Sequence, residues 1–428
     1  MPCETPPDCV MLRPWGYFGA YGCDPPLSMV NLSIAAAAAL SGPVSFTLFT
    51  GDMVAHGCTS VELAMSEAEM VTQLLHEKFV MKGIPVFPLL GNEDVYPDYD
   101  VVPNSDMLKL YGDLWSFALQ CDQCVLEESE EEVMYSLNNA SFHRGGYYYA
   151  IPQPGVRLLL LNTVLYAVDR FTNFGTNFTS DPAGQFEWLQ HQLEEAQSAG
   201  QHVLIAGHVP PSVVEAEKLE NNHVNSYLVS GEEWEERYVA TYMDIISNYS
   251  ELVTGQLFGH THRDSFRATP NTLIANGTLP PLFISPSISP IFHNNAGFKV
   301  FTFDALNTAL VDFSVFFSSY NDINHYYDTS KGDVPSSSDA FKLEYSFKDA
   351  YEVPASIAYI SGDVLESTIE AIGLSDVLYS RFLTFFRVTF NANRLAFLCE
   401  MVNAFNSTYQ QCYDTFLSDP VGTSAGVW

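Results

Sequence analysis

Four apolar runs in this chain each end in a glycine followed by a side chain that can bind a metal. The runs cover residues 44–50, 84–90, 202–206 and 252–258, and short runs of this kind are typical of buried strands. The motifs at their ends are Gly51-Asp52, Gly91-Asn92-Glu93-Asp94, Gly207-His208 and Gly259-His260-Thr261-His262. Helix-like segments at 27–40, 61–82, 105–119, 181–197 and 232–248 lie between the strand-like runs. This alternation predicts an α/β fold, a mostly parallel or mixed sheet with helices on both faces.

The polar residues after these runs are candidate metal ligands. The carboxyl ends of parallel strands meet at one edge of a sheet, so we expect Asp52, Asn92, His208, His260 and His262 to lie close together. Alone, Asp52 would be interpreted as a helix cap and Asn92 as a turn residue, and their joint order favours a site. Carboxylate, amide and imidazole donors suit Zn²⁺, Mn²⁺ or iron better than Ca²⁺ or Mg²⁺.

The second half of the chain shows a different pattern. Consecutive strand-like runs at 266–269, 281–285, 299–304 and 308–316 predict a second, antiparallel sheet. Residues 321–338 are rich in Asn, Asp, Ser and Tyr and are interpreted as a loop or linker. A strand-like run at 341–347 and helical segments follow. We therefore divide the chain into a region of residues 1–320, the linker, and a small C-terminal helical subdomain of residues 339–428.

Charge limits the possible partners. The chain has 18 Lys plus Arg and 51 Asp plus Glu, a formal net charge of −33, which would repel a nucleic-acid polymer. We expect a small substrate and a monomer. No run is apolar and long enough to span a membrane.

Cysteines and glycosylation sequons indicate an oxidising compartment. The eight cysteines are disulfide candidates: Cys3, Cys9, Cys23, Cys58, Cys121, Cys124, Cys399 and Cys412. Six Asn-x-Ser/Thr sites are candidate glycosylation acceptors: Asn31, Asn139, Asn177, Asn248, Asn276 and Asn406. Together they predict a secreted or lysosomal glycoprotein. The first residues, Met-Pro-Cys-Glu-Thr-Pro-Pro, show no signal-peptide pattern.

The motif order resembles the calcineurin-like metallophosphoesterases, and longer segments resemble acid sphingomyelinase and the sphingomyelinase-like phosphodiesterases. These segments are Gly22-Cys23-Asp24-Pro25-Pro26, Phe49-Thr50-Gly51-Asp52, Gly145-Gly146-Tyr147-Tyr148, Leu161-Asn162-Thr163, Gln185-Phe186-Glu187-Trp188-Leu189, residues 255–264 and Asn294-Asn295-Ala296-Gly297. The resemblance implies a four-layer α+β sandwich and hydrolysis of a phosphodiester by metal-activated water. The substrate class that it implies is sphingomyelin-like or nucleotide-like, a small phosphodiester or lipid head group.

The resemblance also implies residue roles. Asp52 corresponds to the carboxylate that bridges two metals, while Asn92, His208 and His260 complete one Zn²⁺ site and His262 belongs to the other. His208 and position 93 fall in the catalytic set. Position 93 holds Glu where the family has the histidine thought to protonate the leaving group. A carboxyl beside a cation is pulled toward its ionised form, so we expect Glu93 to be a poorer proton donor than histidine.

A second departure concerns the family's Asp-x-His motif, which is absent upstream of Cys23. Without it the second site keeps only Asp52 and His262, fewer than the three protein ligands of a catalytic zinc site, so we expect it to be weak or empty. One explanation is that the N-terminal part is missing from this sequence. The alternative is a secreted pseudoenzyme that keeps the fold for binding. His56 and His143 are candidate replacement proton donors.

Overall fold

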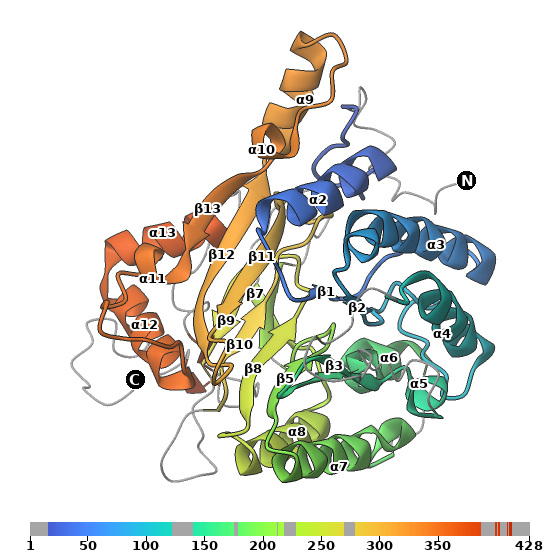
Figure 1. Cartoon of the computed structure of the whole chain (residues 1–428), viewed down its shortest axis with the longest axis vertical. Helices are drawn as coiled ribbons and strands as arrows, with labels where there is room; N and C mark the ends of the chain where they lie inside the picture. The colour runs from blue at the N-terminus through green and yellow to red at the C-terminus, as the bar shows by residue number, and fades with distance from the viewer. Residues whose placement is uncertain are drawn as a thin grey trace.

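The largest element of the fold is a six-stranded sheet in the order β3-β4-β5-β8-β10-β9 (Figure 1). A computed structural model describes residues 16–121, 140–174, 179–211, 213–217, 228–268 and 279–386, with Cys399, Met401, Val402, Tyr409, Gln411 and Cys412. The strands are β3 (Tyr148–Gln153), β4 (Val156–Leu160), β5 (His202–Ala206), β8 (Val253–Phe258), β9 (Ser265–Arg267) and β10 (Leu282–Ile284). β4, β5, β8 and β10 run parallel, whereas β3 and β9 are antiparallel edge strands. The predicted α/β class is confirmed.

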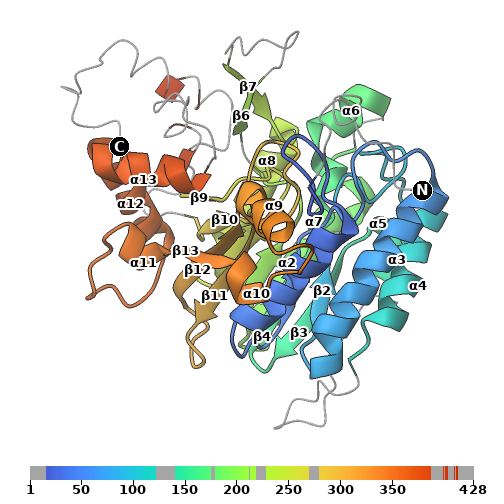
Figure 2. The same cartoon turned by 90° about the horizontal axis from the view of Figure 1, so that it is seen from above.

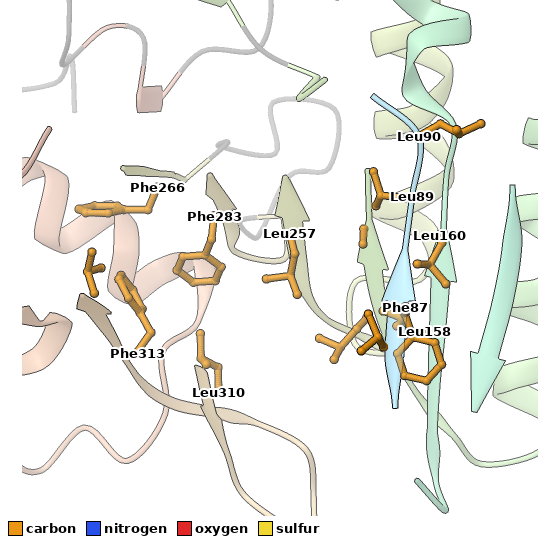
Figure 3. Packing of buried hydrophobic residues seen from close by; sticks show 14 of the residues in the cluster. Phe87, Leu89, Leu90, Leu158, Leu160, Leu257, Phe266, Phe283, Leu310 and Phe313 are labelled. Atoms are coloured by element: carbon orange, nitrogen blue, oxygen red, sulfur yellow. The ribbon is translucent and has the colours of Figure 1, made fainter. Parts of the chain in front are cut away.

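Side chains of the central strands alternate between two hydrophobic cores, because successive strand residues point to opposite faces. Leu158 and Leu160 of β4 lie in the core shown in Figure 3, near Phe87. Leu159 and Leu161 instead pack with residues of α7 (Gln185–Ser198) and α8 (Glu236–Asn248), which cover the other face (Figures 1 and 2). A sheet buried on both faces produces continuous apolar runs, which explains why the sequence revealed these strands.

A two-stranded parallel pair delivers the first two motifs. β1 (Thr47–Phe49) pairs with β2 (Val86–Pro88), and α3 (Val61–Lys78) connects them. α3 begins after Ser60, whose side chain accepts a hydrogen bond from the Leu63 N–H. α4 (Asp106–Ala118) stands beside α3 in Figure 1. Asp52 and Asn92 lie in the loops that directly follow β1 and β2, at the carboxyl ends of these two strands.

The second sheet is smaller than the sequence predicted. It contains β11 (Ala296–Phe303), β12 (Leu310–Ser318) and β13 (Lys342–Ser346), all antiparallel. The prediction that residues 266–269 and 281–285 belong to it is wrong. β10 pairs in parallel with β8, and β9 pairs with β10, so both extend the six-stranded sheet. Their spacing along the chain matched a hairpin, but the parallel partner of β10 is set by tertiary packing.

A buried ion pair joins the two sheets. Lys299 Nζ of β11 lies 2.6 Å from Asp264 Oδ1, and the Tyr345 hydroxyl of β13 donates to the other oxygen of Asp264. Lys299 Nζ also donates to the carbonyl oxygens of Ser265 and Ile284. Because a buried charge needs full compensation, these contacts fix β11 and β13 against the loop that follows β8.

Helix α2 (Leu27–Leu40) has the predicted bounds, whereas residues 321–338 differ from the prediction of a loop or linker. The structure has helix α9 (Tyr320–Thr329) there, followed by the short α10 (Ser337–Ala340). Ser319 caps α9 by accepting from the Asp322 N–H, and Tyr320 and Ile323 are buried. The serine cap and the burial of two apolar side chains stabilise a helix here, although most residues of the segment are polar.

Helices dominate the C-terminal part, as predicted. They are α11 (Phe347–Ala350), α12 (Gly362–Leu374) and α13 (Asp376–Phe386), and Cys399 and Cys412 form a disulfide. The division at residues 320 and 338 stays a prediction. In the part of the chain that the structure describes, no helix combines the length and apolarity needed to cross a bilayer.

Candidate metal centre

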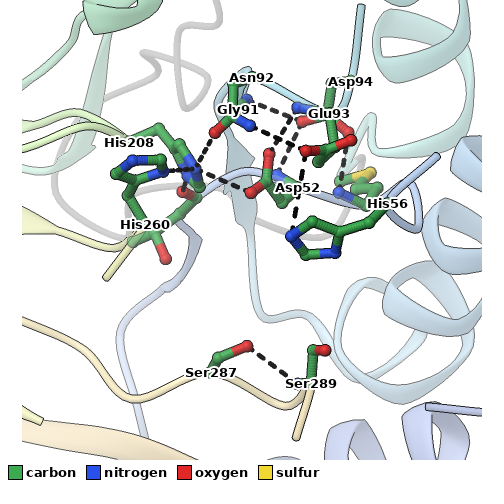
Figure 4. A network of polar contacts seen from close by, with 12 residues as sticks. Asp52, His56, Gly91, Asn92, Glu93, Asp94, His208, His260, Ser287 and Ser289 are labelled. Carbon is green, nitrogen blue, oxygen red and sulfur yellow. Dashed lines mark hydrogen bonds and ion pairs between the residues drawn. The ribbon is translucent and has the colours of Figure 1, made fainter. Parts of the chain in front are cut away.

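Asp52, Asn92, His208 and His260 converge on one point (Figure 4). His208 Nε2 lies 2.9 Å from Asp52 Oδ2, 3.1 Å from Asn92 Oδ1 and 3.3 Å from His260 Nδ1. Ligand atoms of Asp52, His208 and His260 all lie within 4.8 Å of one another. Four of the five predicted metal ligands are therefore brought together, with a carboxylate, an amide oxygen and two ring nitrogens facing one volume.

The glycines of the motifs are required for this convergence. A Cβ on Gly51, whose φ is +93°, would lie 2.7 Å from His208 Nδ1 and from the Gly91 nitrogen. A Cβ on Gly91 would lie 2.0 Å from Asp52 Oδ1. Asp52 and His260 have φ of 58° and 69°, a left-handed conformation that costs a non-glycine residue about 1–2 kcal/mol. Such strain persists where the surroundings hold it, as they do in functional sites.

Asp94 ties the first two motifs together. Its Oδ2 accepts hydrogen bonds from the N–H groups of Asp52 and Gly91, each at 2.8 Å, and its Oδ1 accepts from Met53 N–H at 2.8 Å. The Glu93 N–H donates to Asp52 Oδ1 at 3.0 Å. Burial and the Asp52 charge raise the pKa of Asp94 to about 6. Its role is to hold the β1 and β2 termini, which the sequence motif alone did not reveal.

His56 lies between two carboxyl groups on one side of Asp52. Its Nδ1 is 3.1 Å from Asp24 Oδ1, and its Nε2 is 3.9 Å from Glu93 Oε1. Burial opposes the charged form of His56, but Asp24 and Glu93 outweigh burial and raise its pKa to about 9. Burial and the Asp52 charge raise the pKa of Glu93 to about 8. His56 and Glu93, with Asp24 on the far side of the imidazole, can therefore hold a proton beside Asp52.

The fifth predicted ligand, His262, stands apart from the four. Its ring centroid lies 5.6 Å from that of His56 and 4.7 Å from that of Phe292. Burial, reinforced by His56, lowers the pKa of His262 to about 3, so the ring is neutral. Its Nδ1 is buried without a hydrogen-bond partner among the described residues. His143, the other candidate proton donor, packs against Gly112 and not against Glu93.

Sequence reasoning missed two contacts of His260. Glu233 Oε2 lies 3.1 Å from His260 Nε2, and the Tyr99 hydroxyl lies 3.4 Å from the same nitrogen. Glu233 follows the hairpin of β6 (Val213–Glu217) and β7 (Leu228–Glu232), and Tyr99 follows the Gly91 motif by a loop. Neither residue belongs to a motif that directly follows an apolar run, so no local pattern indicates either of them.

A cavity of about 1100 Å³ opens onto the centre. Its lining includes consecutive residues of β1 and β11 and residues of α2 and α3 such as Ile34 and Leu75. Asp52, His208, His260 and His262 also line it. The ligand-type side chains therefore face a space large enough for a small organic molecule.

The structure describes only some of the cysteines and glycosylation sequons. The predicted disulfide use is confirmed for Cys399 and Cys412, and Cys23, Cys58 and Cys121 are also disulfide-bonded. Cys3, Cys9 and Cys124 lie outside the described residues, as do four of the sequons, Asn139, Asn177, Asn276 and Asn406. Asn31 on α2 and Asn248 at the end of α8 are exposed.

Curated proteins similar to this chain are phosphodiesterases by name. Sphingomyelinase phosphodiesterase D of Dictyostelium discoideum is 27% identical over 91% of this chain and 79% of its own length. Acid sphingomyelinase-like phosphodiesterase 3b of Homo sapiens is 29% identical over 82% of this chain and 71% of its own length. Cyclic GMP-AMP phosphodiesterase SMPDL3A of Homo sapiens is 26% identical over 93% and 82%, respectively.

Among solved structures, a dimetal phosphatase from Danio rerio overlaps with a TM-score of 0.36 at 11% identity, over 68% of this chain and 82% of that one. The family model described as calcineurin-like phosphoesterase matches residues 32–264, more than half of the chain. That range spans all four motifs of the centre. By this match and by the relatives above, the chain is an enzyme of a kind that uses a divalent metal. The family match shows that the chain belongs to the calcineurin-like phosphoesterase family, and its sphingomyelinase-like phosphodiesterase relatives extend over most of its length.

Proposed function

We propose that this protein hydrolyses a small phosphodiester with a divalent cation held by Asp52, Asn92, His208 and His260. The observation that carries the proposal is the convergence of their donor atoms, all within hydrogen-bond distance of His208 Nε2. Two imidazoles with oxygen donors fit Zn²⁺, whose usual ligands are ring nitrogens and carboxylates. When bound, a divalent cation polarises a phosphoryl oxygen and supplies a water nucleophile at mild pH.

A second cation position is proposed beside His262. Its neutral ring and the unpartnered Nδ1 suit a ligand. Asp52 Oδ1, which accepts from the Glu93 N–H and does not face His208, is the other donor proposed for this position. Two protein ligands hold a cation less tightly than the three of an ordinary catalytic zinc site, so this position is the weaker one.

His56 is the proposed source of the proton for the leaving group. Asp24 orients its Nδ1, and Ser289 Oγ in turn donates to Asp24 Oδ1 at 2.7 Å. The opposite ring nitrogen faces Glu93, on the side of Asp52 away from His260. A histidine held charged by a carboxylate is a suitable general acid. Glu93, in place of the family's histidine, then lies beside the donor as a second protonatable group.

The substrate is proposed to be a small phosphodiester, either sphingomyelin-like or nucleotide-like. The names of the relatives include both sphingomyelin and cyclic GMP-AMP phosphodiesterases. The net charge of −33 disfavours a polyanionic polymer. The disulfides and the exposed sequons at Asn31 and Asn248 support a secreted or lysosomal glycoprotein, which we propose to be a monomer.

Metal content and turnover test this function together. We expect at least one zinc per chain and hydrolysis of bis(p-nitrophenyl) phosphate, both lost in His208→Ala because the ring touches all three other ligands. His325→Ala, at an exposed position of α9, is the matched control and should retain both. Zinc is counted by elemental analysis of the purified protein.

The rival function is a binding glycoprotein that keeps the fold without catalysis, favoured by Glu93 at the position of the family's histidine. About two zinc per chain with turnover would rule out this rival. One zinc or none, with no turnover even in Glu93→His, would rule out the enzyme. Glu93→His restores the family's histidine, so it separates a lost proton donor from a lost metal site.

A further inference from the structure

An imidazole binds a cation through one ring nitrogen, and the acceptor on the other nitrogen fixes its proton and its orientation. His208 shows this arrangement. Its Nδ1 lies 2.6 Å from the carbonyl oxygen of Thr50, which can only accept, so Nδ1 carries a proton. Its Nε2 therefore faces Asp52 and Asn92.

His260 uses the opposite pair of atoms. Its Nδ1 faces the shared point, 3.3 Å from His208 Nε2, and its Nε2 lies 3.1 Å from Glu233 Oε2. The His260 and Glu233 side chains are 16% and 20% exposed, so water competes only in part for this contact. An ionised carboxylate only accepts, and it is a stronger acceptor than a carbonyl.

The backbone at Glu233 is anchored through its own carbonyl group and through the next residue. The Val168 N–H donates to the Glu233 carbonyl oxygen at 3.0 Å. The next residue, Trp234, is fully buried and donates from Nε1 to the Val209 carbonyl oxygen at 2.9 Å. Val209 directly follows His208. The segment that carries Glu233 is thus fixed to the strand end that carries His208, so the carboxylate is held at a defined place.

We propose that Glu233 is a positioning residue of the metal centre. It fixes the proton of His260 on Nε2, turns Nδ1 toward Asp52, Asn92 and His208, and raises the basicity of Nδ1. This role rests on the proposed function, because it requires a cation at those ligands. Glu233 does not itself contact the cation. His260 has a left-handed φ of 69°, so a contact that restrains its side chain adds to what the surrounding backbone must hold in place.

Zinc affinity without substrate tests the role. Glu233→Ala should raise the Zn²⁺ dissociation constant by about 10–100-fold, the usual effect of removing a group that orients a metal-binding histidine. Glu233→Gln keeps the size and a weaker oxygen acceptor, so its loss should be smaller. Glu236→Ala is the control, because it removes the same charge at an exposed position three residues further along. Competition with a chromophoric chelator gives each constant.

A spectroscopic readout separates positioning from general damage. Long-range ¹H–¹⁵N spectra of the metal-free protein should show the His260 proton on Nε2 in the wild type, and a mixture of the Nδ1–H and Nε2–H neutral tautomers in Glu233→Ala. Unchanged zinc affinity in Glu233→Ala, or an equal loss in Glu236→Ala, would overturn the role of Glu233 and leave the proposed function intact. No zinc binding by the wild type would overturn both.

Discussion

At the level of single residues, the sequence indicates the ligands but not their supports. Asp52, Asn92, His208 and His260 each follow a glycine at the end of an apolar run, so a local pattern marks them. Asp24 lies in a segment that resembles the family and His56 is a candidate proton donor from the sequence, but no apolar run precedes either of them directly, and Glu233 has no signal in the sequence at all. Their positions depend on how distant segments pack, which no short stretch of sequence encodes.

His56 gives a prediction at this scale. His56→Gln should reduce turnover of a phosphodiester with an alkoxide leaving group by about 10²–10⁴-fold, the usual contribution of general-acid catalysis. A p-nitrophenolate leaving group needs little protonation, so the loss with bis(p-nitrophenyl) phosphate should be much smaller. His191→Gln, at an exposed position of α7, is the control. Steady-state rates on both substrates are compared, and equal losses would contradict a proton-donor role.

At the level of elements, the spacing of apolar residues predicts whether a segment is a helix or a strand better than it predicts which strands pair. The bounds of α2 agree with the prediction because its apolar residues and the prolines before it are local signals. The pairing of β10 with β8 is not local, and the sequence therefore placed β10 in the wrong sheet. α9 was missed because its stabilising features are one serine cap and two buried side chains in a polar segment.

Glu344 of β13 gives a prediction about the stability of an element. Burial, with the nearby Asp264, raises the pKa of this carboxyl to about 9, far above the ordinary value for glutamate. The folded protein therefore binds this proton more tightly than the unfolded chain, and the free energy of unfolding should fall as pH rises from about 5 toward 9. Below the pKa of Glu344 in the unfolded chain, the carboxyl is protonated in both states, so it adds no pH dependence to the free energy of unfolding.

Glu344→Gln removes that proton equilibrium. The variant should be more stable than the wild type at pH 8, and its stability should change less between pH 5 and pH 8. Urea unfolding at each pH measures both effects. Glu370→Gln, exposed on α12, is the control. A wild type and a Glu344→Gln variant with parallel pH profiles would contradict the prediction.

At the level of the whole molecule, two sheets and their helices must pack against a large excess of negative charge. The formal net charge of −33 destabilises any compact state through self-repulsion. Ions screen this repulsion, with a Debye length of about 30 Å at 0.01 M and about 8 Å at 0.15 M salt. The free energy of unfolding should therefore depend on ionic strength as well as on the packing of the core.

The corresponding prediction concerns salt. Raising NaCl from 10 to 150 mM at pH 7 should raise the Tm by a few degrees, because screening relieves repulsion in the folded state more than in the expanded one. At pH 5, where carboxylates begin to gain protons, the same change should have a smaller effect. Circular dichroism melts at both pH values measure it, and a Tm that falls with salt at pH 7 would contradict it.

The bond between Trp234 and Val209 has a further consequence for the hairpin of β6 and β7. β6 and β7 both lie between Val209 and Trp234 in the sequence, and the hydrogen bond from Trp234 Nε1 to the Val209 carbonyl oxygen joins the two ends of this segment. Lengthening such a segment costs little free energy, because the cost of closing a loop grows only slowly with its length. We therefore expect other sequences to be accepted in place of β6 and β7, provided that Glu233 and Trp234 are kept, because Glu233 contacts the ligand His260. In such a graft the approach to the metal centre would change while Asp52, Asn92, His208 and His260 keep their supports.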